Sequence, residues 1–223
     1  NKGAIAVLNP AYDNEPFYYV TGKNYDFYGY HIDDAATGEP VKTAASVAVP
    51  FEINGSQDLM LAKADQKTDI DAAGKTDEVS VDKAYSAFAA RRGVHPNLLF
   101  KHQLARFTFE IVAGAESGNL INVDGISIES VASGDLKVVG ADRGLANLAS
   151  DKVEFFLQEK TAEGTLQALT PVKPLPFVSE ANKTNVKSVG ESLMVVPGAS
   201  SYTLKVYTSQ DNTQSQIDPQ VWD

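Results

Sequence analysis

The chain contains no cysteine among its 223 residues. This absence excludes disulfide bonds, thiol catalysis and zinc sites built on thiolate ligands. It leaves the compartment open, because many exported bacterial proteins also lack cysteine. Basic residues are outnumbered: 19 Lys and Arg stand against 29 Asp and Glu, a net charge of −10, and Arg91-Arg92 is the one adjacent basic pair. A chain of this charge is poorly suited to nucleic acid or to anionic membrane surfaces.

Long hydrophobic runs are missing as well. No run approaches the roughly 18 apolar residues that a transmembrane helix needs, so we predict no transmembrane segment. No signal peptide is visible. The chain begins at Asn1 without Met, so we expect a processed piece, and the missing leader leaves export open. A length of 223 residues allows one large domain or two of about 100 residues each.

Catalytic motifs are also lacking. The sequence has no G-x-S-x-G elbow, no phosphate-binding glycine loop and no H-E-x-x-H helix. Its three histidines are His31, His95 and His102. His102 shares a strand face with Phe100 and Leu104, which predicts a half-buried histidine with one hydrogen-bonded nitrogen. The alternative, a catalytic base, has no nucleophile near it in sequence. We therefore expect no enzymatic activity, no catalytic residues and no cofactor.

One acidic segment, residues 65–82, partly matches the pattern of a calcium-binding loop. Asp69-x-Asp71 with Gly74 resembles the start of such a loop, but Ala73 and Ser80 stand where oxygen ligands are required. We expect a solvated loop and no metal site, with a weak adventitious cation site as the alternative.

The features that are present indicate an all-β protein. Short runs of alternating apolar residues recur between turn residues, a spacing typical of a β-sandwich or barrel. Asn54-Gly55 and Asp124-Gly125 are strong turn dipeptides, and the second predicts a hairpin. The predicted strands lie at 3–8, 17–20, 25–32, 47–53, 58–64, 120–123, 126–131, 136–139, 153–157, 166–169, 193–196 and 202–207.

The most distinctive stretch, residues 98–112, predicts one long strand that changes face partway. From Ala105 to Ile111 the odd positions are apolar, including Phe107 and Phe109, whereas before Leu104 the phase is reversed. One residue of slip exchanges the two faces of a strand. A bulge near Leu104 and Ala105 would absorb that slip.

A single segment has helical spacing. Val81, Ala84, Tyr85 and Phe88 predict one short helix over residues 81–91 inside a long connection, with Ser80 as N-cap and Gly93 as its end. Arg91 and Arg92 at its end form a solvated terminus or, alternatively, a protease-sensitive loop. Aromatic residues nearer the N-terminus favour strand packing, with sugar stacking as the alternative; these are Tyr12, Phe17, Tyr18 and Tyr19.

Two segments are distinctive by their order: Asp58-Leu59-Met60-Leu61-Ala62-Lys63, and then Leu99-Phe100-Lys101-His102-Gln103-Leu104-Ala105-Arg106. Together they resemble the fimbrillin-like family of Bacteroidales, the major and minor fimbrium subunits or type V pilins. That family carries a D-L-(L/M)-x-A strand, a variable loop, and L-x-F-x-H-x-L-(A/S)-(R/K) running into an alternating strand. Further similar segments follow the family order, namely Tyr25–Tyr30, Ile126–Leu136, Leu193–Gly198 and Tyr202–Tyr207.

The resemblance covers roughly residues 25–208. It implies two Greek-key β-sandwich domains of transthyretin-like topology, for which soft sequence near residues 140–150 suggests domains at 1–145 and 146–223. It also implies export as a lipoprotein to the outer membrane, trimming by an arginine-specific protease, and assembly into a fimbrium with other subunits by β-strand exchange. Cell adhesion is the expected role. A surface lipoprotein that binds a glycan or other ligand on the same fold is the alternative.

The long strand yields a first prediction. If Phe107 and Phe109 fill the core, replacing either with Ala should lower the free energy of unfolding by about 3–5 kcal/mol through cavity formation. Denaturant unfolding of Phe107→Ala measures this cost. An unchanged thermal midpoint would show that the inward face is assigned wrongly.

Overall fold

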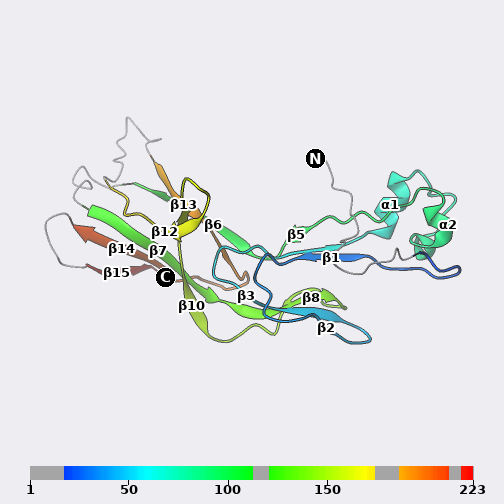
Figure 1. The fold of residues 1–223 in the computed structure, drawn as a ribbon, viewed down its shortest axis with the longest axis horizontal. Helices are drawn as coiled ribbons and strands as arrows, with labels where there is room; N and C mark the ends of the chain where they lie inside the picture. Colours follow the sequence, from blue (N-terminus) through cyan, green and yellow to red (C-terminus); the bar gives the residue numbers. More distant parts are fainter. Residues whose placement is uncertain (1–17, 113–120, 174–185, 211–216, 223) are drawn as a thin grey trace. The chain divides into compact units, whose positions relative to one another are not determined.

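A computed structural model describes residues 18–112, 121–173, 186–210 and 217–222 (Figure 1). Antiparallel sheets dominate it and helices are few, which confirms the expected β class; no barrel forms in the described part. The chain divides into two compact units. Unit 1 contains the described residues up to Tyr28 and Ala62–Leu99, and unit 2 contains Gly29–Leu61 and the described residues from Phe100 onward. The boundary expected near residue 145 therefore falls within unit 2.

The helical elements all belong to unit 1. They are α1 (Gln66–Ala72), η1 (Val81–Lys83, a short 3-10 helix) and α2 (Ala87–Ala90). They surround a buried apolar cluster formed by Ala64, Ile70, Val79, Ala84, Tyr85, Ala89 and Val94. No helix in the described residues has the length and apolarity needed to cross a bilayer.

The single helix predicted over residues 81–91 is wrong in detail. Ser86 interrupts it, because its side chain accepts a hydrogen bond from the Ala89 amide and so begins α2 as an N-cap. The expected cap, Ser80, makes no side-chain cap bond. The expected end is correct: Gly93 has a φ of 80°, and the Val94 amide closes the turn on the Ala89 carbonyl.

The acidic segment at residues 65–82 is not the solvated loop that we expected, because part of it is helical. Residues 66–72 form α1, which begins where the Asp65 side chain accepts from the Thr68 amide at 2.8 Å. Asp69 lies on the inner face of this helix and is only 5% exposed. The pattern of carboxylates thus reflects a cap and a buried hydrogen-bonding group, not a calcium loop.

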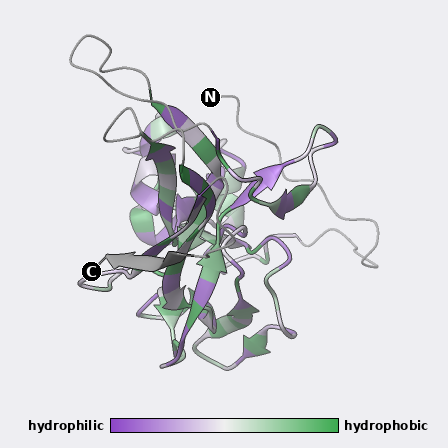
Figure 2. Cartoon of the chain, turned by 90° about the vertical axis from the view of Figure 1, so that its left-hand side faces the viewer, coloured by the Kyte–Doolittle hydropathy of each residue, from purple (hydrophilic) through white to green (hydrophobic). Residues whose placement is uncertain are grey.

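Unit 2 is built from strands. Apolar and polar residues alternate along them, as Figure 2 shows. The strands of the described residues, in both units, are β1 (Tyr28–His31), β2 (Val41–Lys42), β3 (Val47–Glu52), β4 (Met60–Lys63), β5 (Lys101–His102), β6 (Ala105–Ile111), β7 (Ile121–Val131), β8 (Ser133–Val139), β9 (Gly144–Ala146), β10 (Lys152–Phe156), β11 (Gln158–Lys160), β12 (Leu166–Ala168), β13 (Lys187–Val195), β14 (Leu204–Gln210) and β15 (Ile217–Trp222).

These strands form several sheets. The two four-stranded sheets have the orders β10-β7-β14-β15 and β2-β3-β8-β9, and smaller sheets have the orders β1-β4-β5, β13-β6 and β11-β12. β7 runs without interruption through Asp124-Gly125, so the hairpin predicted at that dipeptide is wrong. Gly125 instead faces the ring of Tyr207 on β14, where an added Cβ would lie 3.6 Å from the ring.

The β13-β6 pair packs against the inner face of the β10-β7-β14-β15 sheet. Buried side chains from both layers meet there, and close glycines permit the approach. An added Cβ at Gly55 would lie 3.0 Å from Leu193 and 3.2 Å from Phe155. The buried residues of these layers are Val189, Leu193, Val195, Ile126, Ile128, Phe155 and Leu157.

The long strand expected over residues 98–112 is divided. β5 pairs with β4 through Met60↔His102 and Leu61↔Lys101, whereas β6 pairs with β13. The change of face at Leu104 and Ala105 was placed correctly, but it ends one strand and begins another in a different sheet. Phe107 and Phe109 are half-buried on β6. Phe107 meets the ring of Tyr202 edge-on at 5.3 Å, so its replacement should cost less than the full core value.

Gly190 provides a sharper test of the packing. Its φ is 62°, and an added Cβ would lie 2.6 Å from Leu157 and 2.8 Å from the Gln158 carbonyl oxygen. Gly190→Ala should therefore lose about 1 kcal/mol to backbone strain and about 1–3 kcal/mol more to overpacking. Gly164→Ala is the matched control, because Gly164 has a φ of 84° with nothing within 4 Å. Equal losses in denaturant unfolding would show that the close approach of β13 is absent.

A charge network joins three strands of the β10-β7-β14-β15 sheet. Glu154 on β10 accepts from the Ser127 hydroxyl at 2.5 Å, from the Tyr207 hydroxyl, and from Lys205 at 3.1 Å. Lys205 also pairs with Glu129 at 2.6 Å. Burial opposes ionisation of Glu154, but these hydrogen bonds outweigh it and hold the pKa of the carboxyl below its ordinary value of 4.5. The network therefore ties β7, β10 and β14 together.

The lowered pKa of Glu154 predicts a loss of stability in acid. Because the folded pKa lies below the unfolded one, the stabilisation is complete above about pH 4.5 and disappears as the pH falls through the folded value. Glu154→Gln should flatten the pH dependence of unfolding in that window. Glu110→Gln is the control, because Glu110 is exposed and has no side-chain partner among the described residues. Identical profiles for Glu154→Gln and the parent would contradict the network.

Candidate functional site

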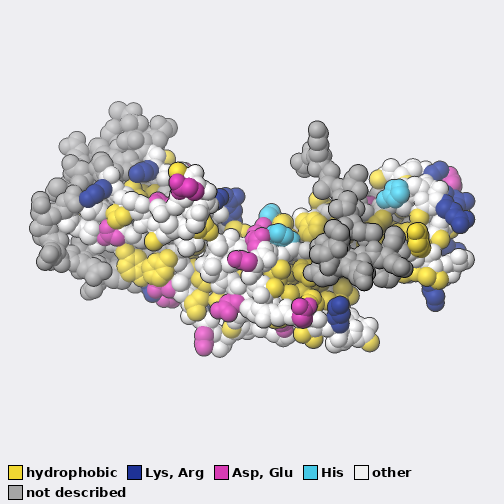
Figure 3. Space-filling model, viewed as in Figure 1, with side chains coloured by type: hydrophobic (Ala, Val, Ile, Leu, Met, Phe, Trp, Pro, Cys, Tyr) yellow, Lys and Arg dark blue, Asp and Glu magenta, His cyan; other side chains and the backbone are white. Residues whose placement is uncertain are grey.

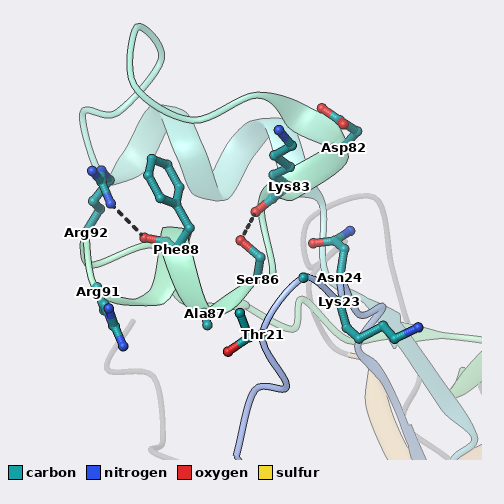
Figure 4. Close-up of a pocket in the computed structure, with 11 residues that line it drawn as sticks. Thr21, Lys23, Asn24, Asp82, Lys83, Ser86, Ala87, Phe88, Arg91 and Arg92 are labelled. Atoms are coloured by element: carbon teal, nitrogen blue, oxygen red, sulfur yellow. Dashed lines mark hydrogen bonds between the residues drawn. The ribbon is translucent and has the colours of Figure 1, made fainter.

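A pocket of about 680 Å³ lies in unit 1, between the segment at residues 21–24 and the η1–α2 segment (Figure 4). Its lining is mostly polar and basic. It consists of Thr21, Gly22, Lys23, Asn24, Asp82, Lys83, Ser86, Ala87, Phe88, Arg91 and Arg92. Pockets that hold small ligands commonly enclose about 300–1,000 Å³, so this one has a suitable size.

Backbone hydrogen bonds join the two walls of the pocket. Asn24 and Ser86 form an isolated antiparallel bridge. The Tyr25 amide donates to the Tyr85 carbonyl at 3.1 Å, and the Tyr85 amide donates to the Asn24 side-chain oxygen at 2.9 Å. The walls are therefore held by the same residues that enter the buried cluster beneath them.

Tyr85 anchors that cluster. Its hydroxyl donates to the buried Asp69 carboxylate at 2.6 Å, and its ring lies edge-on to Phe27. Burial, followed by the hydrogen bond to Asp69, raises the pKa of Tyr85 well above its ordinary value. Tyr85 therefore remains a neutral donor at any physiological pH.

Four cations line the pocket. Lys23, Lys83 and Arg91 have no side-chain hydrogen bond or ion pair among the described residues. Arg92 is held in place: it donates to the Phe88 carbonyl at 3.1 Å and pairs with Glu78 at 3.4 Å. Figure 3 shows dark blue Lys and Arg side chains at the end of the unit where Figure 1 places α2. This is a local positive surface on a chain of net charge −10.

An exposed aromatic ring lies beside these cations. Phe88 on α2 is 47% exposed, and the Arg92 guanidinium lies 3.5 Å from the centre of its ring. Stacking of this kind fixes the guanidinium plane and leaves its other face open. The pocket therefore offers an apolar ring and fixed charge side by side.

The hydroxyl of Ser86, which lines the pocket, is engaged in local hydrogen bonds. The Ser86 hydroxyl donates to the Lys83 carbonyl at 2.8 Å and accepts from the Ala89 amide, so it serves as a cap. The four cations of the lining suit the pocket to binding an anion. Within the described residues, no three His, Asp or Glu side chains are grouped so as to hold a metal ion.

Arg91 and Arg92, expected at a protease-sensitive loop, lie at the end of α2 and line this pocket. The amides of Arg91, Arg92 and Gly93 all bond back to carbonyls in the helix. Val94, which follows, is buried at 1% exposure. Cleavage at this pair would require the turn to open first, because proteases bind extended backbone.

His102 has one hydrogen-bonded nitrogen, as expected: its Nδ1 lies 2.6 Å from Asp58 Oδ2. The ring is 65% exposed, so the expectation of a half-buried residue is wrong. β5 is only two residues long and lies at a sheet edge, which leaves the ring in solvent. His102 lines a second pocket of about 470 Å³ with Ser56 and Ser192, but no described hydrogen bond joins it to either serine.

A second candidate surface is the edge of the β10-β7-β14-β15 sheet. β15 forms the outermost strand and pairs with β14 through Leu204↔Trp222, Lys205↔Val221, Val206↔Gln220 and Thr208↔Ile217. Among the described residues β15 pairs with no other strand. It is thus held to the sheet along one side of its backbone.

Sequence reasoning identified part of these sites. It singled out Arg91, Arg92 and Phe88, but it placed Phe88 on the inner stripe of a helix and did not connect any of them with Lys23 or Lys83. Those cations come from segments far apart in the chain, and only the pairing of Asn24 with Ser86 brings them together. No local pattern signals such a pairing.

Comparison with known proteins does not extend these observations. No protein-family model, no curated protein and no solved structure matches the chain.

Proposed function

We propose that this protein is a structural subunit of a surface fimbrium, which assembles by exchange of β-strands and supports cell adhesion. The observation that carries the proposal is the position of β15, an outermost strand bound to one neighbour only. The order of the fimbrillin-like motifs in the sequence points in the same direction.

Strand exchange is physically simple at this edge. The backbone bonds between β15 and β14 form equally well when the two strands belong to different copies of the chain. Main-chain bonds supply the affinity, and the alternation of side chains selects the register. The ladder already shifts its register between Val206 and Thr208, which marks a point where the pairing is less regular.

The proposal includes the finer fold and location implied by the family. The packing of the β13-β6 pair on the β10-β7-β14-β15 sheet supports a sandwich-like layering. The second sandwich and the Greek-key, transthyretin-like topology rest on the resemblance to the family. Export as a lipoprotein, display at the cell surface and fimbrial partner subunits belong to the same proposal. It assigns no enzymatic role to the chain.

A pair of engineered cysteines tests the exchange. Because this chain has no cysteine of its own, any disulfide within or between its copies must come from the engineered pair. Val206 and Gln220 are directly opposed on β14 and β15, so Val206→Cys with Gln220→Cys should form a disulfide. The full precursor that carries this pair is treated with an arginine-specific protease, oxidised and run on a non-reducing denaturing gel. Exchange predicts covalent ladders that collapse to monomers on reduction.

The matched control is Gln158→Cys with Ala168→Cys, an opposed pair on the β11-β12 hairpin. This disulfide should form within one chain and give no ladder. Polymers that collapse to monomers without reduction in the Val206/Gln220 variant would show that β15 is not the exchanged strand. A protein that stays monomeric after cleavage at every concentration would overturn the fimbrial assignment.

A further inference from the structure

We propose that the basic pocket of unit 1 binds an acidic sugar, a saccharide that carries a carboxylate or sulfate group. This inference does not depend on strand exchange. It assigns the pocket between residues 21–24 and the η1–α2 segment as a ligand site that recognises one oxyanion and the sugar ring attached to it.

The charge of the pocket is the first argument. Three of its cations, Lys23, Lys83 and Arg91, have no anionic partner among the described residues, and Arg92 shares Glu78 with Lys75. One carboxylate, Asp82, also lines the pocket. Figure 4 places Asp82 next to Lys83, at the opposite end of the group from Arg91 and Arg92. The ligand oxyanion is therefore expected on the arginine side.

The second argument is the arrangement of the arginine side. Guanidinium groups bind carboxylate and sulfate oxygens through paired N–H donors. Arg92 is already oriented by the Phe88 carbonyl, the Phe88 ring and Glu78. A group fixed before binding loses little side-chain entropy when the ligand arrives. Arg91 lies one residue away at the same turn and adds a second, unpaired guanidinium.

The third argument is the apolar ring among polar groups. Phe88 is 47% exposed at the pocket, and an exposed ring beside charge suits a ligand with both an apolar face and an oxyanion. Sugar rings present such a face of C–H groups. The Thr21 hydroxyl and the Asn24 side-chain amide line the opposite wall, where Asn24 uses its oxygen to hold the Tyr85 amide. Its NH2 group makes no hydrogen bond to other described residues and can donate to a ligand hydroxyl.

The charge of the whole chain limits the size of the ligand. Beyond this pocket acidic residues outnumber basic ones, because the chain as a whole carries a net charge of −10. A long polyanion such as nucleic acid would be repelled over most of its length. A small saccharide with one or two anionic groups stays within the positive region.

Titration calorimetry of the full chain tests the proposal with four probes: 3′-sialyllactose, 3′-sulfolactose, lactose and inorganic sulfate. At least one of the two acidic sugars should bind saturably, and lactose and inorganic sulfate should each bind at least about tenfold more weakly. The stronger of the two acidic sugars identifies the anionic group. Affinity should fall as salt is added, because screening weakens the ion pairs.

Variants locate the site. Arg91→Gln should weaken binding of the better sugar by about tenfold, and Lys23→Gln, on the opposite wall, should weaken it less. Phe88→Leu should reduce the preference for the sugar over inorganic sulfate. Lys67→Gln is the matched control, because Lys67 lies on α1, pairs with Asp71 and does not line the pocket. All these side chains are exposed or at the rim, so unchanged thermal midpoints confirm that folding is intact.

Three outcomes would overturn the proposal. The first is a lack of saturable binding by either acidic sugar. The second is equal binding of inorganic sulfate and the sugars, which would show an unspecific ion site. The third is an equal loss in Lys67→Gln and Arg91→Gln, which would show a general effect of charge.

Discussion

The hydrogen bond between the Tyr85 hydroxyl and the Asp69 carboxylate is the interaction on which unit 1 depends. A buried carboxylate is costly unless donors surround it. Asp69 has two, the Tyr85 hydroxyl and the Asn97 amide. This single carboxylate therefore joins α1 to the segment that begins α2 and to the chain that follows it. The backbone of Tyr85 in turn holds Asn24 and Tyr25, so the pocket walls depend on the same residue.

Unit 2 depends on a different constraint: the backbone of each inner strand must form hydrogen bonds with a neighbouring strand on both sides. β7 meets this need through β10 and β14, and the network around Glu154 joins the same three strands on the outer face. Its inner face carries Ile126 and Ile128, which are almost fully buried. One strand thus organises a hydrophobic layer on one side and a charged layer on the other.

The sequence predicted what depends on local pattern and missed what depends on distant pairing. The alternation of apolar residues located β3 within one residue, because the side chains on its two faces are buried to different degrees. The dipeptide Asp124-Gly125 led to a wrong prediction of a hairpin. Gly125 lies within β7 and faces the ring of Tyr207, so its small size reflects this contact and not a turn. Asp69 was interpreted as part of a solvated loop, because no local sequence pattern indicates that the Tyr85 hydroxyl will bind it in the core. The basic pocket has the same origin: its two walls meet only in the folded chain.

The position of β15 has a consequence for energetics and rates. The number of ladder bonds on β14 is the same whether β15 comes from its own chain or from a neighbour. Enthalpy therefore hardly distinguishes the closed monomer from a linked assembly, and protein concentration and chain entropy decide between them. Exchange would require the whole ladder from Leu204 to Thr208 to separate before it can form again. In the proposed exchange, opening of the closed monomer and release of an assembled copy would both pass through this same separation of β15 from β14.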